Sequence, residues 1–252
     1  MRWAWLVSLA MLLLAVPAGA QETVVLGADP WCPHTCDAGP DRPGYMIELA
    51  QSAFALHGVR VVYTTAPWAR VMAEVRDGKL DGAVGVLRAE AADLTLHEEA
   101  LGMQTNAFAV RKGDPWTFGG LDTLKGRIVA TIKDYSYSSD LDAWLASDAT
   151  EVQAAAGENA LEKNLRKLVA GRVDVVVEDA AVLKHRLRKF ADRDKIAMAG
   201  GLEGGELFIA FANAEGRNQR LTAMLDSGIR SLRASGELNR ILAKYGLKDW
   251  KG

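Results

Sequence analysis

The start of one predicted helix carries Arg70, whose charge is unfavourable near the positive end of a helix dipole. Pro67 suits the first helical residue, because its ring fixes φ and its missing N–H is not needed there. The apolar residues recur at the spacing of one buried helical face, namely Trp68, Val71, Met72 and Val75. A guanidinium beside free backbone N–H groups could bind an anionic ligand group, with the flat face of Trp68 next to it. The alternatives are a pair between Arg70 and Glu74, and a core position for Trp68.

The two cysteines, Cys32 and Cys36, lie close together in a Pro-rich stretch, residues 30–40. In an oxidising compartment such a pair is expected to form a disulfide that fixes the loop. The alternative is a metal site that includes His34, although two thiols and one imidazole lack a fourth ligand. The spacing excludes a redox C-x-x-C motif.

Residues 1–20 have the pattern of a cleaved signal peptide. Arg2 precedes an apolar run from Trp3 to Val16, and Ala18-Gly19-Ala20 supplies an A-x-A cleavage site. The apolar run is short for a bilayer span, and no cysteine follows it that could carry a lipid anchor. We therefore expect a soluble protein in the periplasm that begins at Gln21.

Composition narrows the function classes. The formal net charge is −2 and no basic or low-complexity block appears, so a nucleic-acid partner is not expected. No nucleophile–base pair or metal triad stands out, so we expect neither an enzyme nor a cofactor.

Short apolar segments alternate with helical patterns along the chain. Strands are expected at 23–28, 59–63, 81–86, 127–132 and 173–179, and helices near 45–56, 67–76, 138–146, 161–168, 221–232 and 238–245. Ser139 and Asp142 stand in capping-box spacing at the start of one of these helices. The alternation predicts an α/β fold with βαβ units and mostly parallel sheets.

Two lobes are expected from a repeated pattern. Residues 78–81 (GKLD) and 171–174 (GRVD) each join a helix to a strand. Segments 105–113 and 206–213 resemble crossings between lobes, so lobe 2 (109–206) is predicted to be inserted in lobe 1 (21–108 and 207–252). A cleft should then lie at the carboxyl ends of the parallel strands.

The chain resembles the type II periplasmic solute-binding proteins, in particular the family 3 group that serves ABC importers. The resemblance rests on five segments in this order: GYMIELA (44–50), PWARVMAEVRDGKLDGAVGV (67–86), FGGLDTLKG (118–126), VAGRVDVVVED (169–179) and RASGELNRILAKYG (233–246). It implies a two-lobed Venus-flytrap fold, with lobe 2 inserted in lobe 1, that closes on a small polar molecule.

The resemblance also implies site residues. Arg88 stands where the family has a Ser or Thr, Asp93 where it has the arginine that holds the ligand's α-carboxylate, and Asp179 where it has the aspartate that binds the amine. An ordinary α-amino acid is therefore not the expected ligand. The predicted ligand contacts are Trp31, Trp68, Arg70, Arg88, Tyr135, Ser136, Tyr137 and Asp179, with Arg70 and Asp179 facing each other across the cleft.

The predicted function is capture of a small polar, amino-acid-like or otherwise charged solute by a monomer that delivers it to an ABC permease. One alternative is a sensory subunit that docks on a membrane kinase or receptor. The other is a dehydratase-like enzyme on the same fold.

Overall fold

The computed structural model describes residues 21–39, 41–157, 159–214 and 216–251; the predicted signal peptide, 1–20, lies outside them. The strands are β1 (Thr23–Ala28), β2 (Arg60–Thr65), β3 (Gly82–Leu87), β4 (Thr95–Leu96), β5 (Gly102–Arg111), β6 (Ile128–Ile132), β7 (Glu151–Ala155), β8 (Val175–Asp179) and β9 (Ile196–Phe211). The helices are α1 (Tyr45–Ala55), α2 (Trp68–Arg76), α3 (Ser139–Leu145), α4 (Ala160–Val169), α5 (Ala180–Leu187), α6 (Arg217–Ala234) and α7 (Glu237–Lys244), with 3₁₀ turns η1 (Arg88–Ala91), η2 (Leu121–Leu124) and η3 (Arg193–Lys195).

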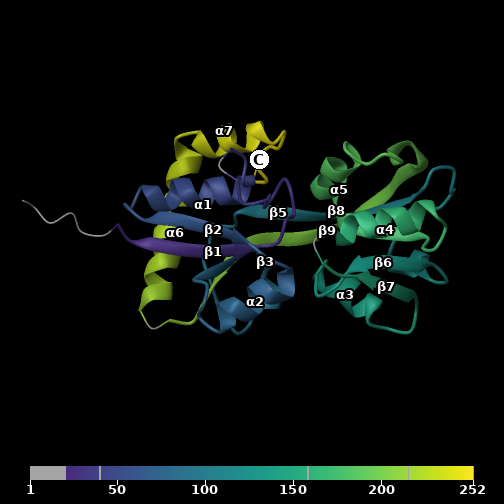
Figure 1. Ribbon diagram of the computed structural model, residues 1–252, viewed down its shortest axis with the longest axis horizontal. Coiled ribbons are helices and arrows are strands. Elements are labelled where there is room, and N and C mark those ends of the chain that lie inside the picture. The colour runs from purple at the N-terminus through teal and green to yellow at the C-terminus, as the bar shows by residue number, and fades with distance from the viewer. Residues whose placement is uncertain (1–20, 40, 158, 215, 252) are drawn as a thin grey trace, which may run out of the picture.

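Two lobes share one sheet, as Figure 1 shows. Its strand order is β2-β1-β3-β9-β5-β8-β6-β7, and β4 pairs with β9. The outer strands of each lobe are parallel, as predicted, whereas β5 and β9 run antiparallel to their neighbours and pass through both lobes. The predicted lobe boundaries, 108/109 and 206/207, fall within β5 and β9.

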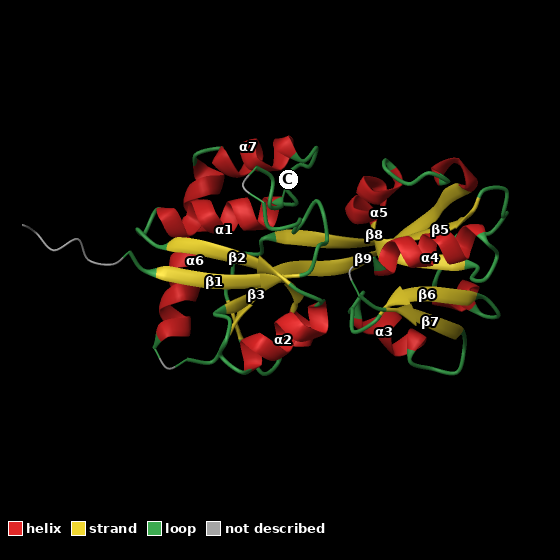
Figure 2. Ribbon diagram, in the orientation of Figure 1, coloured by secondary structure: helices red, strands yellow, loops and turns green. Residues whose placement is uncertain are grey.

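Helices cover both faces of the sheet in each lobe (Figure 2). In lobe 1, α1, α6 and α7 bury their apolar residues on one face of the sheet, and α2 covers the other. In lobe 2, α4 and α5 share one core and α3 packs on the opposite face. Burial of these apolar faces is the main stabilising term of each lobe. Within the described residues, no helix has the length and apolar character needed to span a bilayer.

The repeated GKLD and GRVD segments occupy equivalent places. Asp81 accepts a hydrogen bond from the Val25 N–H at 2.7 Å, and Asp174 accepts one from the Ile128 N–H at 3.0 Å. Each aspartate thus ties the start of one parallel strand to its neighbour. Arg217 pairs with Asp81, and Arg111 pairs with Asp174 in the same way. The sequence repeat therefore marks the same βαβ construction in both lobes.

Two helix starts differ from the prediction by one residue. Pro67 is the N-cap of α2 and not its first helical residue. Ser138, not Ser139, caps α3 by accepting the Leu141 N–H. Asp142 accepts hydrogen bonds from the Tyr137 N–H and the Ser136 hydroxyl, so it holds the preceding loop.

Candidate ligand-binding site

The first loop of lobe 1 meets the carboxyl ends of the lobe 2 strands. Trp31 Nε1–H donates to Glu178 Oε1 at 2.8 Å, and His34 Nε2–H donates to Asp179 Oδ1 at 2.8 Å. The Tyr135 hydroxyl, after β6, donates to the Asp29 carboxylate, after β1. The lobes are therefore in contact across the predicted cleft.

The disulfide between Cys32 and Cys36 closes the loop that carries Trp31 and His34. This pairing agrees with the prediction. The two sulfurs are bonded to each other, and the His34 ring stacks on Trp31 and contacts the Tyr45 hydroxyl at 2.9 Å. The three side chains are therefore not arranged as the alternative metal site. Within the described residues, no group of three or more potential metal ligands comes together.

Asp179 is a structural residue in this arrangement. Its Oδ1 accepts the N–H groups of Ala181 and Val182 at the start of α5, and its Oδ2 accepts the Thr105 N–H at 3.0 Å. Burial by itself raises the pKa of this carboxyl, but the imidazole of His34 and the backbone donors outweigh burial and lower it. The carboxylate is 2% exposed and its oxygens already have partners.

A small inner site lies beside these contacts. It has a volume of about 20 Å³ and is lined by Asp29, Trp31, Trp68, Val84, Gly85, Glu90, Gln104, Tyr135 and Ser136. An adjoining outer site of about 230 Å³ shares Asp29, Trp31, Trp68 and Tyr135 and adds Lys133, Asp134 and Glu178. The combined site is small, aromatic and acidic.

Three carboxyl groups of the site have raised pKa values because burial disfavours their charged forms. The pKa is about 6 for Asp29, about 7 for Glu90 and about 8 for Glu178. Glu178 is 1% exposed, and its Oε2 has no hydrogen-bond partner in the described part of the chain. Among the described residues, no arginine or lysine lines the inner site beside Asp29 and Glu90.

Four of the predicted contacts line the site, namely Trp31, Trp68, Tyr135 and Ser136. Tyr137 does not line it, since it is buried in the lobe 2 core with its hydroxyl accepting the Ile132 N–H at 2.8 Å. Of the neighbouring acids on β8, Glu178 and not Asp179 lines the outer site. That these side chains contact a ligand stays a prediction.

The predicted cations lie outside the site. Arg70 is 69% exposed at its side chain and pairs with Glu74 at 2.8 Å. The prediction that Arg70 faces Asp179 is therefore wrong. Arg70 lies on the side of α2 opposite its buried residues, and the Asp179 carboxylate contacts His34 instead. Arg88 is exposed, with its guanidinium 4.5 Å from the centre of the Phe208 ring.

Sequence reasoning missed Asp29, Glu90 and Gln104. Asp29 directly follows β1 and so lies at the carboxyl end of a parallel strand, where ligands bind in open α/β sheets. That position is the sequence signal that could have identified it. Glu90 turns back to accept the Leu87 N–H at 2.9 Å, a local contact that brings it to the site. Gln104 lies on β5 and donates to Asn106 Oδ1 at 2.9 Å, and no sequence pattern distinguishes it.

Comparisons with known proteins agree with this architecture. The family model of bacterial extracellular solute-binding proteins, family 3, matches residues 25–248. A comparison with curated protein sequences found no match.

Solved structures show the same fold at low identity. An ancestral arginine-binding protein bound to arginine is 18% identical, with a TM-score of 0.74 over 89% of this chain and 98% of that one. A substrate-binding protein of an amino acid ABC transporter from Streptococcus pneumoniae, bound to L-arginine, is 20% identical, with a TM-score of 0.70 over 88% and 94%. A histidine kinase sensor domain is 20% identical, with a TM-score of 0.74 over 91% and 99%.

Proposed function

The chain belongs to the bacterial extracellular solute-binding proteins of family 3, and we propose that it captures a small organic cation between its lobes for an ABC importer. The family supports a solute-binding role. The chemical class of the solute is inferred from the inner site. Delivery to a permease is inferred from the structural similarity to a substrate-binding protein of an amino acid ABC transporter. Binding without chemical conversion is part of the proposal.

The observation that carries the proposal is the excess of carboxyl groups in the site. Asp29 and Glu90 line the inner site, and Glu178 lines the outer site and accepts the Trp31 indole N–H. Burying carboxylates without a cation is costly, which is why their pKa values are raised. A cationic ligand supplies the missing charge and allows Asp29 and Glu90 to ionise.

The aromatic side chains favour the same ligand class. Trp31, Trp68 and Tyr135 line both the inner and the outer site, and Tyr135 meets Trp31 edge to face with ring centres 6.4 Å apart. The faces of indole and phenol rings attract cations, more strongly where water is excluded. Carboxylates and aromatic rings together suit an ammonium or guanidinium group.

A ligand carboxylate has no matching clamp. Asp93, at the position where the resemblance implies an arginine, lies on the surface and pairs with Arg76 at 2.7 Å. The one lysine or arginine that lines the outer site among the described residues is Lys133, which is exposed. A cation without an adjacent carboxylate therefore fits better than an α-amino acid.

A sensory role is the second candidate, supported by the similarity to a histidine kinase sensor domain. Both roles share the binding step and differ in the membrane partner. Genes adjacent to this one would distinguish them, because an importer requires a permease and an ATPase whereas a sensor requires a kinase or receptor.

Melting temperatures with matched ligand pairs test the proposed ligand class. The pairs are agmatine and arginine, cadaverine and lysine, and choline and glycine betaine; in each pair the second member adds a carboxylate. At equal concentrations, the cation without the carboxylate should raise the melting temperature more than its carboxylated partner does. A cation present at one hundred times its Kd stabilises the protein by about 2.7 kcal/mol relative to the unliganded protein. Stronger stabilisation by the carboxylated members, or no stabilisation by any cation, would contradict the proposal.

A further inference from the structure

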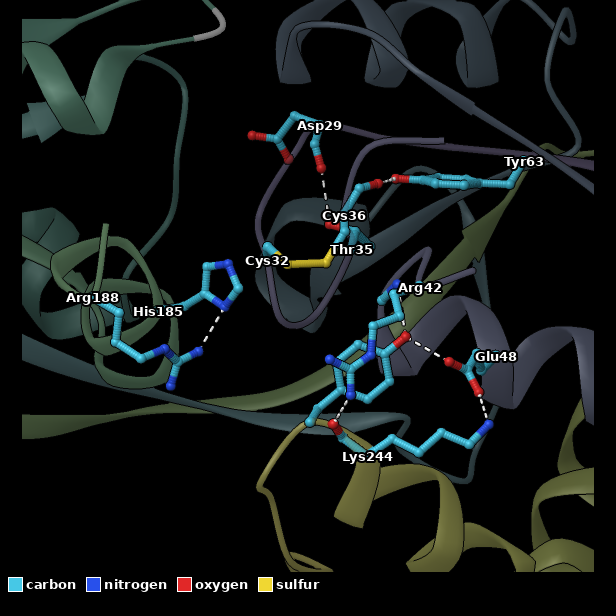
Figure 3. The surroundings of a disulfide bond; sticks show 12 residues. Asp29, Cys32, Thr35, Cys36, Arg42, Glu48, Tyr63, His185, Arg188 and Lys244 are labelled. Carbon is cyan, nitrogen blue, oxygen red and sulfur yellow. Dashed lines mark hydrogen bonds and ion pairs between the residues drawn. A yellow bond between two sulfur atoms is a disulfide. The ribbon is translucent and has the colours of Figure 1, made fainter. Parts of the chain in front are cut away.

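A second, larger groove lies between the lobes beside the disulfide. Its volume is about 730 Å³, and both lobes line it. Lobe 1 contributes the loop that contains Cys32, Cys36 and Arg42 and the end of α7; lobe 2 contributes the start of α4 and the outer side of α5. Figure 3 shows the His185 ring directed toward the disulfide, with Arg42 and Lys244 on the lobe 1 side.

Basic side chains dominate this groove. They are Arg42 and Lys244 from lobe 1 and His185, Arg186, Arg188 and Lys189 from lobe 2, against Asp37 and Glu162. Two cations have carboxylate partners, since Arg186 pairs with Glu162 and Lys244 with Glu48. Among the described residues, Arg42, Arg188 and Lys189 have none.

The unpaired cations are positioned by neutral groups. The Arg42 guanidinium donates to the Lys244 carbonyl and lies 5.4 Å from the centre of the Tyr245 ring. Arg188 Nη2–H donates to His185 Nδ1 at 2.9 Å. That bond requires an unprotonated Nδ1, so the neutral ring carries its hydrogen on Nε2, where it can donate to an acceptor.

Like charges from the two lobes act on each other across the groove. The pKa of His185 is lowered first by burial and then by Arg188, Lys189, Arg186 and Arg42. Arg42 belongs to lobe 1, whereas His185 belongs to lobe 2. Lobe contact therefore gathers positive charge from both sides, an arrangement that an anion would stabilise.

We propose that this groove binds a small polyvalent anion with phosphate or carboxylate oxygens, which bridges Arg42 of lobe 1 and the His185, Arg188 and Lys189 side chains of lobe 2. Guanidinium groups hold such oxygens through paired N–H donors. The groove has room for an anion larger than inorganic phosphate. Because the anion would contact both lobes, it would favour their closed arrangement. The site is separate from the inner site, so it does not depend on the proposed cation.

Calorimetric titration with inorganic pyrophosphate tests this site, at about 150 mM KCl so that non-specific charge effects are screened. The wild-type protein, without any cation ligand, should bind pyrophosphate. Arg42→Gln and Arg188→Gln should each weaken binding by about tenfold or more. Lys184→Gln is the matched control, because Lys184 is exposed on α5, which ends just before Arg188, and does not line the groove.

Small-angle scattering adds a test of bridging. Pyrophosphate should reduce the radius of gyration of the wild type or of any fraction with separated lobes, and should not do so in Arg42→Gln. Unchanged affinity in both arginine variants, an equal loss in Lys184→Gln, or no pyrophosphate binding would overturn the proposal. Melting temperatures of the unliganded variants should match the wild type, which separates loss of binding from misfolding.

Discussion

Replacing Asp179 with alanine is expected to lower the free energy of unfolding by about 3 kcal/mol or more, because a buried charged acceptor with four hydrogen-bond donors is removed. The carboxylate accepts bonds from His34, from the Thr105 N–H and from two N–H groups at the start of α5. Without it, these buried donors lose their acceptor, and α5 also loses its cap. Urea unfolding followed by circular dichroism measures the change.

The control is Asp93→Ala, which removes an aspartate from an exposed pair with Arg76 and should have a much smaller effect. Asp179→Asn should fall between wild type and alanine, because the amide oxygen still accepts from backbone N–H groups. If Asp179→Ala unfolds at the same urea concentration as Asp93→Ala, the structural role of Asp179 is contradicted.

Removing a carboxylate from the inner site should weaken cation binding by about 30- to 4000-fold, which corresponds to about 2–5 kcal/mol. The variants are Asp29→Asn and Glu90→Gln, which keep the shape and one acceptor oxygen. Calorimetry with the tightest cation of the ligand panel measures the loss. Stability without ligand should stay equal or rise, because each change removes a buried group that resists ionisation.

Glu74→Gln is the matched control for these variants. Glu74 lies on α2, whose first residue Trp68 lines the site, but Glu74 itself does not line it and pairs with the exposed Arg70. Its cation affinity should equal that of the wild type. Equal affinities in all three variants would show that the cation binds elsewhere.

Much of the fold could be predicted from the sequence because its signals are local. The spacing of Val71, Met72 and Val75 gave the buried face of α2, and the two GxxD segments marked the paired βαβ units. Strand β7 and helix α5 were not predicted. Strand β7 is short and partly exposed, and α5 begins directly after Asp179 with no break in the sequence that separates it from β8.

The site was harder to predict because its contacts join residues distant in the chain. His34 reaches Asp179 and Trp31 reaches Glu178 across 145 and 147 positions, and no spacing in the sequence encodes these pairs. Arg70 shows the converse, since the i,i+4 spacing predicts Glu74 as a partner and the structure contains that local pair. Tyr137 shared a segment with two residues that line the site, but its ring fills the lobe 2 core.

The pH dependence of cation affinity tests the central claim most directly, namely that Asp29 and Glu90 hold a cation. Without ligand these groups have raised pKa values, about 6 and about 7, so both are largely protonated at about pH 5 and ionised at about pH 8. A cation binds the ionised forms and must displace their protons at low pH. For a permanently charged ligand such as choline or agmatine, calorimetry should show affinity rising by about tenfold or more from about pH 5 to about pH 8, with proton release at the lower pH. An affinity that stays constant or falls over this range would contradict the account.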